Sequence, residues 1–210
     1  MMEAAPTVFV VDDDPSVRKS LGRLLKSAGY RAETFATAGE FMQRGACQGP
    51  SCLVLDMELP DLNGLELQQA LAGTGRSPLI IFISGHGDIP TSVRAMKRGA
   101  LDFLPKPFMA QDLLRVVDEA LDRSRREQKD RLELSIIHER LAHLTPREYE
   151  VLCGVIAGKL NKQIAVDLGI GEKTVKVHRG HVMEKMGAHS VADLVRAVEK
   201  GNTIPPPRRG

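Results

Sequence analysis

Cysteine is scarce in this 210-residue sequence, and long apolar runs are absent. The cysteines, Cys47, Cys52 and Cys153, form no CxxC pair, which argues against a zinc site and against a disulfide framework. Free thiols fit a reducing compartment, so we expect a cytoplasmic protein. The longest apolar runs, such as residues 79–83, are far too short to cross a bilayer. The N-terminus lacks a basic segment followed by an apolar stretch, so no secretory signal is predicted.

Apolar residues make up 42% of the chain, which is enough to bury at least one core. The length suits two modest domains or one larger domain. The net charge is only +2, but residues 1–118 carry a net −2 and residues 145–210 carry a net +4. A basic C-terminal third favours a polyanionic partner, although four charges alone are a weak signal.

Short apolar strands alternate with amphipathic helices over the first 120 residues. Strands are expected at residues 8–11, 31–35, 52–55, 79–83 and 102–104. Helices are expected at residues 15–28, 39–44, 64–71 and 90–98, and from 111 onward, with Asp14 capping the first and Pro15 at its first position. Five such repeats indicate an α/β fold, a five-stranded doubly wound parallel sheet with helices on both faces. Sheets of this kind place functional residues at the carboxyl ends of their strands.

Charged and hydroxyl side chains follow four of the predicted strands. Asp12 and Asp13 follow the first strand, Asp56 the third, Ser84 the fourth and Lys106 the fifth. Each residue alone would be an ordinary turn, loop or surface residue, but these strand ends converge on one edge of a parallel sheet. Clustered carboxylates favour a hard cation such as Mg²⁺ or Mn²⁺, and a carboxylate can also attack a phosphoryl group. We therefore predict that Asp12 and Asp13 hold a metal, that Asp56 accepts a phosphoryl group, and that Ser84 and Lys106 neutralise its oxygens.

The middle of the chain contains neither glycine nor proline and favours a helix. We interpret residues 123–143 as a helical linker that extends the fifth helix. A solvated connector is preferred over a partner-pairing seam because the apolar spacing is irregular. Beyond the linker only helices are expected, with capping boxes beginning at Thr145 and Ser190. The proline-rich end, residues 202–210, is predicted to be disordered.

Residues 161–187 read as a short helix, a turn containing glycines and a second helix, a pattern typical of a helix-turn-helix. The second helix begins with cations and hydroxyls, which suits a helix in the major groove better than a solvated face. His178 and His181 lie three residues apart, but no cysteine or paired carboxylate nearby completes a metal site. The buried side of the helix is predicted to hold Val175, Val182, Met183 and Met186. The residues expected to contact DNA are Lys173, Thr174, Lys176, Val177, His178 and Arg179.

The segments "VFVVDDDPSVR", "CLVLDMELPDLNGLEL" and "LIIFISGHGDIPTSVRAMKRGALDFLPKPF" resemble the receiver domain of two-component response regulators. The resemblance implies a flavodoxin-like fold in which Asp56 is the phosphoacceptor and Lys106 contacts the phosphate. It also implies that Ser84 and Phe103 are switch residues and that the Lys106–Pro107 bond is cis. The implied metal ligands are Asp12, Asp13, Asp56 and the backbone carbonyl of Glu58.

The segments "LTPREYEVL", "LNKQIAVDLGI" and "KTVKVHRGHVMEKMGAHSVADLV" resemble the LuxR-type DNA-binding domain. The whole chain thus resembles a FixJ/NarL-type response regulator. The predicted organisation is a receiver at 1–122, a linker at 123–143, a DNA-binding domain at 144–201 and a tail at 202–210. Two positions depart from the family pattern: Leu160 replaces a small hydroxyl residue, and Gly171 replaces the serine that usually caps the recognition helix.

The leading hypothesis is a phosphorylation-dependent transcription regulator of bacterial-type signalling. A sensor histidine kinase would phosphorylate Asp56, and the protein would then bind promoter DNA as a homodimer. The family suggests an activator, and it suggests no enzymatic activity on an external substrate. One alternative is a DNA-binding regulator that does not depend on phosphorylation. The other is an aspartyl-phosphate phosphatase with Glu58 as its acid, which would give no reason for a helix-turn-helix.

Overall fold

The structure, a computed structural model, describes residues 5–45, 47, 49–73, 78–85 and 89–201. The predicted disordered tail, residues 202–210, lies outside the described residues. The chain divides into two units, Met1–Gln128 and Lys129–Gly210, each with its own apolar core. Within the described ranges no helix is both long enough and apolar enough to span a membrane.

The first unit contains a parallel sheet with strand order β2-β1-β3-β4-β5, which confirms the predicted fold class. Three of the strands are apolar runs whose side chains are almost entirely buried in the sheet, whereas the fifth, at one edge, is buried only at Leu104. β2 at the other edge is more polar and only half-buried. The strands are β1 (Thr7–Val11), β2 (Arg31–Phe35), β3 (Ser51–Asp56), β4 (Leu79–Ser84) and β5 (Asp102–Pro105).

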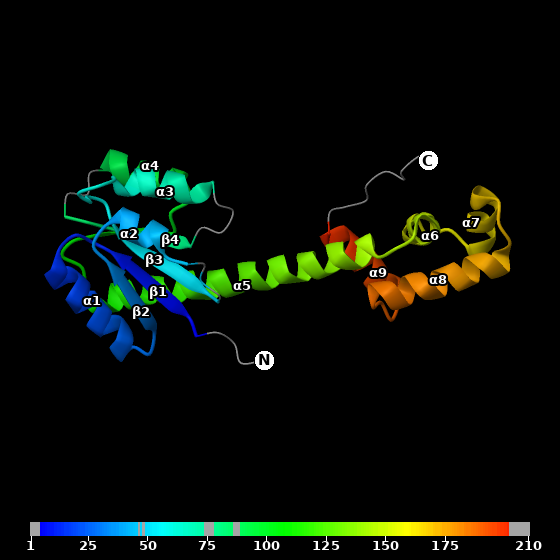
Figure 1. The fold of residues 1–210 in the computed structure, drawn as a ribbon, viewed down its shortest axis with the longest axis horizontal. Helices are drawn as coiled ribbons and strands as arrows, with labels where there is room; N and C mark the ends of the chain where they lie inside the picture. The colour runs from blue at the N-terminus through cyan, green and yellow to red at the C-terminus, as the bar shows by residue number, and fades with distance from the viewer. Residues whose placement is uncertain (1–4, 46, 48, 74–77, 86–88, 202–210) are drawn as a thin grey trace. The chain divides into compact units, whose positions relative to one another are not determined.

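Helices cover both faces of this sheet (Figure 1). Alternate strand residues point to opposite faces, so Val10 and Val54 pack against α1 and α5, whereas Phe9 and Leu53 pack against α2, α3 and α4. The helices of this unit are α1 (Pro15–Ser27), α2 (Ala38–Gln43), α3 (Gly64–Ala72), α4 (Ile89–Lys97) and the first part of α5 (Ala110–Ala142).

Polar side chains cap the starts of α1 and α3, just beyond the ends of β1 and β3. Asp14 precedes α1 with Pro15 in its first turn, and the Asp14 carboxylate accepts a hydrogen bond from the Ser16 N–H at 2.7 Å, as predicted. Asn63 and Glu66 form a capping box at the start of α3. α1 and α3 therefore begin directly after the loops that follow β1 and β3.

The long helix α5 contains residues of both units. In the first unit its buried Ser124 hydroxyl accepts a hydrogen bond from the Ser51 N–H at 3.0 Å, at the start of β3. In the second unit, Arg140 Nη1 donates to the Met186 carbonyl at 2.7 Å and Ile137 is buried. The predicted linker is thus helical as expected, but some of its residues pack against one unit or the other.

The second unit is all-helical, with α6 (Pro146–Ile156), α7 (Asn161–Leu168), α8 (Glu172–Met186) and α9 (Val191–Lys200). Gly169 ends α7 with a left-handed φ of 64°, and Gly171 caps α8 without a side chain, as the sequence predicts. Ser190 caps α9 by accepting from the Asp193 N–H. Val175, Val182 and Met186 lie in the core as predicted, whereas Met183 is half-buried at its edge.

A buried acid links α6 to α8. Glu148 closes the predicted capping box with Thr145, and its side chain is only 4% exposed. Lys185 Nζ lies 2.6 Å from its carboxylate, and the Thr145 N–H donates to the same oxygen at 2.8 Å. Burial acts to raise the pKa of Glu148, but the bonds from Lys185 and Thr145 outweigh it and lower this pKa to about 2.

We expect this carboxylate to make the second unit sensitive to acid. Its pKa falls from an ordinary 4.5 to about 2 on folding, so its stabilisation is present above pH 4.5 and is lost as the pH falls toward 2. The free energy of unfolding should drop by on the order of 3 kcal/mol over that range. Denaturant titrations at several pH values should show a Glu148→Gln variant losing most of this dependence. Glu199→Gln, at an exposed acid of the same unit, should keep it; an equal slope in all three proteins would contradict the assignment.

Candidate functional site

The predicted site residues follow strands that end at one edge of the sheet. Val11 pairs in register with Leu55, and Asp56, one residue further on, pairs with Ile83. Ser84 pairs with Pro105, and the Lys106 N–H donates to the Ser84 carbonyl at 2.7 Å. The parallel register therefore brings these loops together, as the sequence predicts.

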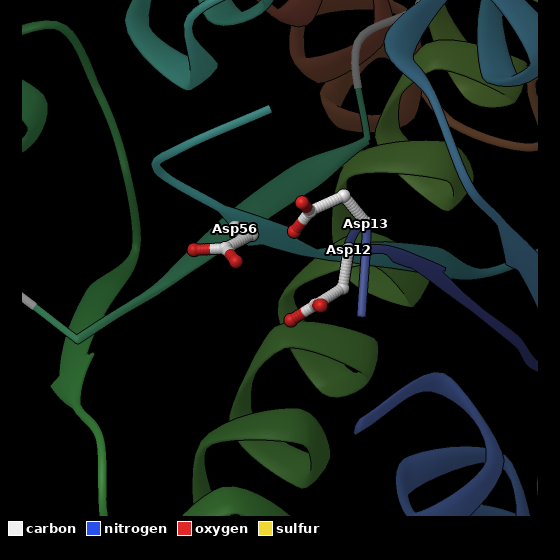
Figure 2. Close-up of side chains that lie close together, drawn as sticks. All are labelled: Asp12, Asp13 and Asp56. Atoms are coloured by element: carbon white, nitrogen blue, oxygen red, sulfur yellow. The ribbon is translucent and has the colours of Figure 1, made fainter. Parts of the chain in front are cut away.

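Three carboxylates meet at this edge (Figure 2). Asp12, Asp13 and Asp56 each offer an oxygen, and these oxygens lie within 4.8 Å of one another. Asp12 and Asp56 are buried, whereas Asp13 is exposed. The donor set contains only carboxylates, without a thiolate or imidazole, and it suits a hard cation with oxygen ligands. The residues present therefore form an acidic cluster that can hold a metal ion.

Lys106 joins the two buried acids. Its Nζ lies 2.7 Å from an oxygen of Asp12 and 2.9 Å from an oxygen of Asp56. Burial opposes the charged ammonium, but the hydrogen bonds that it donates to both carboxylates outweigh this effect and raise the pKa of Lys106. Burial also raises the pKa of Asp56, and the neighbouring Asp12 adds to this rise while Lys106 opposes it. One ammonium among three acids leaves an excess of negative charge, which a bound cation would relieve.

The two predicted switch residues lie on β4 and β5, the strands that follow β3 in the sheet. Ser84 ends β4 and is 1% exposed. Phe103 on β5 is half-buried, with its ring centroid 6.5 Å from that of Phe82. The Lys106–Pro107 peptide bond is cis, as predicted. The backbone N–H of Glu58 lies 3.4 Å from an oxygen of Asp56, whereas the metal-binding role of the Glu58 carbonyl stays a prediction.

Sequence reasoning missed residues that hold the loops of the site. Arg18 on α1 reaches back, and its Nη1 donates to the carbonyls of Asp12 and Asp13, each at 2.7 Å. Asp61, in the loop after β3, accepts hydrogen bonds from two N–H groups at the start of α2, at 3.2 and 2.8 Å. No periodicity marks either residue. Gly64 had a signal as the first residue after a cap: a Cβ there would lie 2.8 Å from the Asp56 carbonyl, so only glycine fits.

The predicted DNA-contacting residues differ in exposure along α8. Lys173, Thr174, Lys176 and Val177 are exposed, whereas His178 and Arg179 are half-buried. Arg179 Nη1 donates to the side-chain oxygen of Asn161 at 2.9 Å, so it also ties α8 to the start of α7. The structure thus presents the first four residues to solvent and engages Arg179 within the helix-turn-helix.

The two departures from the family pattern have different local consequences. Leu160 precedes α7 and has no acceptor for a cap, although its N–H donates to the Gln163 side chain at 2.8 Å. Its side chain is 69% exposed. Gly171 caps α8 through its backbone alone, so no hydroxyl is available at this position for a phosphate.

Among the described residues, no group of three candidate metal ligands includes the two histidines of α8. His181 Nδ1 lies 3.6 Å from the buried carboxylate of Glu148. Among the residues that the structure describes, only the cluster of Asp12, Asp13 and Asp56 brings three candidate metal ligands together. The expectation that His178 and His181 bind no metal stays a prediction.

Two protein-family models together match most of the chain. The family described as "Response regulator receiver domain" matches residues 8–118. The family described as "Bacterial regulatory proteins, luxR family" matches residues 142–198. These segments correspond to the parallel sheet with the acidic cluster and to the helix-turn-helix.

Similar proteins share both parts. Nodulation protein W of Bradyrhizobium diazoefficiens is 48% identical over 192 residues, covering 91% of this chain and 85% of the relative. Transcriptional regulatory protein FixJ of Azorhizobium caulinodans is 41% identical, covering 93% of this chain and 92% of the relative. The solved structure of the response regulator StyR has a TM-score of 0.87 and 48% identity, covering 94% of this chain and all of that one. The chain therefore belongs to the two-component response regulators that join a receiver to a LuxR-type DNA-binding domain, and it acts as a phosphorylation-dependent, DNA-binding transcription regulator.

Proposed function

We propose that Asp56 accepts a phosphoryl group from a phosphohistidine of a sensor histidine kinase. One oxygen of its carboxylate attacks the phosphorus, and the bond from phosphorus to the kinase imidazole breaks. The observation that carries the proposal is the burial of Asp56 beside Asp12, with the Lys106 ammonium 2.9 Å away. Burial excludes competing water, and Lys106 is placed to receive a phosphoryl oxygen.

Asp12, Asp13, Asp56 and the carbonyl of Glu58 would hold Mg²⁺ or Mn²⁺. When bound, the metal would neutralise charge on the phosphoryl oxygens. Side chains of the protein would supply the other interactions. Arg18 fixes the backbone of Asp12 and Asp13, and Ser84 and Lys106 bind the new phosphoryl group.

The same reaction is proposed to change the face formed by α4 and β5. Ser84 precedes this segment and Lys106 follows it, so their movement toward a phosphoryl group would pull on both of its ends. Phe103 lies on β5 and would repack. The face carries exposed apolar side chains beside cations, which suits self-association: Ile89, Val93 and Met96 beside Arg94 and Lys97.

In the second unit, the exposed start of α8 is proposed to enter the major groove of promoter DNA. Lys173, Thr174, Lys176 and Val177 would meet bases and phosphates, with His178 and Arg179 at the side of the contact.

We place the receiver at 1–122, the linker at 123–143 and the DNA-binding domain at 144–201. The family pattern favours an activator that works in the cytoplasm. No observation favours the alternative of an aspartyl-phosphate phosphatase, which would give the helix-turn-helix of the second unit no function.

Phosphorylation is expected to strengthen self-association by roughly 5- to 150-fold, the usual size of a coupling between two sites. Sedimentation velocity with and without acetyl phosphate and a divalent cation measures the change. Val93→Asp should remove the gain because it places a charge on the α4 face. Met42→Asp, at a similarly exposed apolar residue of α2, should retain it. A gain that survives Val93→Asp would show that another surface mediates the association.

A further inference from the structure

Gly180 lies in the interior of α8, where glycine is a poor choice. The helix runs from Glu172 to Met186, and Gly180 has no positive φ that would call for glycine. In a helix interior only proline is less favourable than glycine, because the glycine backbone loses the most freedom on folding. The presence of a glycine at this position therefore needs a reason.

The fold itself gives no such reason. A Cβ built at Gly180 would meet no atom within 4 Å, so alanine would fit without any movement. Gly154 on α6 is different, since its Cβ would lie 2.7 Å from a side-chain carbon of Ile164. Close packing within the chain thus explains Gly154 but not Gly180.

Gly180 lies on the face of α8 that is proposed to contact DNA. Residues three, four and seven apart share one face of a helix, so Gly180 lies on the side that carries Lys173, Lys176 and Val177. All three are exposed, as is Gly180. Gly180 is therefore the one position on this cationic face that has no side chain.

The cationic face of α8 ends just beyond Gly180. The next residues on the same side are Met183, which is half-buried, and Glu184, an exposed acid that would repel phosphates. Lys185, the next cation, is held by Glu148 at 2.6 Å. From Lys173 to Gly180 the helix rises about 10 Å, close to the width of about 12 Å of the major groove. Gly180 thus lies about where a helix inserted at Lys173 would cross the sugar–phosphate backbone.

We propose that the DNA backbone passes against α8 at Gly180, closer than any Cβ would permit. The inference rests on the proposed entry of α8 into DNA and adds the point of closest approach. Glycine here leaves space for the partner, as glycine does wherever a backbone approaches a ligand closely.

Gly180→Ala and Gly180→Leu in the full chain provide the test, because folding and binding should change in opposite directions. Both residues favour helix, so each variant should melt a few degrees higher than the wild type. Binding to a duplex that wild-type protein selects from a random-sequence pool, with acetyl phosphate and Mg²⁺ present, should weaken by roughly 5- to 100-fold, more for leucine than for alanine. Ser135→Ala, at an exposed serine of α5, should gain stability without losing affinity.

The outcomes separate this inference from the proposed function. If Lys176→Ala weakens binding but the Gly180 variants bind like wild type, DNA contacts α8 without a close approach at Gly180. If none of these variants changes DNA affinity, α8 does not enter DNA at all, and the inference and that part of the proposed function both fail. A lower melting temperature for Gly180→Ala would show that the fold requires the glycine, which would also overturn the inference.

Discussion

Asp56→Asn is expected to reduce labelling by radioactive acetyl phosphate to background. An amide is a poor nucleophile toward phosphorus, and a neutral group also removes one of the three carboxylates of the cluster. The substitution keeps the size of the side chain, so the sheet should remain folded. Measuring incorporated phosphate per chain, with the melting temperature of each protein, separates loss of chemistry from loss of structure.

Asp14→Asn is the matched control for this experiment. It makes the same chemical change two residues from Asp12, but Asp14 caps α1 by accepting from the Ser16 N–H, and asparagine caps a helix equally well. The Asp14 variant should therefore be labelled like wild type. Label that persists in Asp56→Asn and maps to Asp12 or Asp13 would assign the phosphoacceptor to the other strand.

Lys176→Ala is expected to cost roughly 1–3 kcal/mol of binding free energy at the preferred DNA site if its ammonium reads a guanine. Its effect on random DNA should be smaller. Lys176 is exposed on α8, and the buried Val175 beside it orients the helix. Salt titrations of binding to a preferred and a random duplex measure both effects in one experiment.

Other cations of the chain should behave differently from Lys176. Arg179→Ala should weaken binding to all sequences alike and lower the salt slope by about one if its guanidinium also holds a phosphate. Lys129→Ala removes the same charge from an exposed position on α5 and should leave affinity and slope nearly unchanged. If Lys129→Ala and Lys176→Ala weaken binding equally, Lys176 contributes only through the net charge of the protein and not through a contact of α8 with DNA.

The fold and most of the acidic site could be predicted because they depend on local patterns. An apolar run followed by an acid defines both a strand and its functional end, and parallel pairing then brings Asp12 and Asp56 together. Helix starts at Asp14 and Thr145 were predicted for the same reason, since a cap acts on its own first turn. Several boundaries of the first unit differ from the prediction by one residue, as for β1, which begins at Thr7 rather than Val8.

What the sequence did not show depends on where long side chains reach in three dimensions. Arg18 bonds two carbonyls five and six residues behind it, and Asp61 caps a helix more than twenty residues earlier. Neither contact is marked in the sequence by a hydrophobic periodicity or by a motif. For the same reason the sequence predicted Arg179 only as a DNA contact and did not show that its guanidinium also bonds Asn161 on the preceding helix. Such contacts follow only once the elements are placed.

The bonds that hold α8 matter for anyone who would redesign the DNA specificity of this regulator. Arg179 is bound to Asn161 on α7, and Lys185 is bound to Glu148 on α6. A recognition helix transplanted from another regulator would leave Asn161 or Glu148 facing a partner that no longer fits, and an unpaired buried acid is costly. The unit of exchange in a chimera is therefore α6 through α8 together with the Thr145 cap, residues 145–186, so that the bonds of Glu148 and Asn161 stay together.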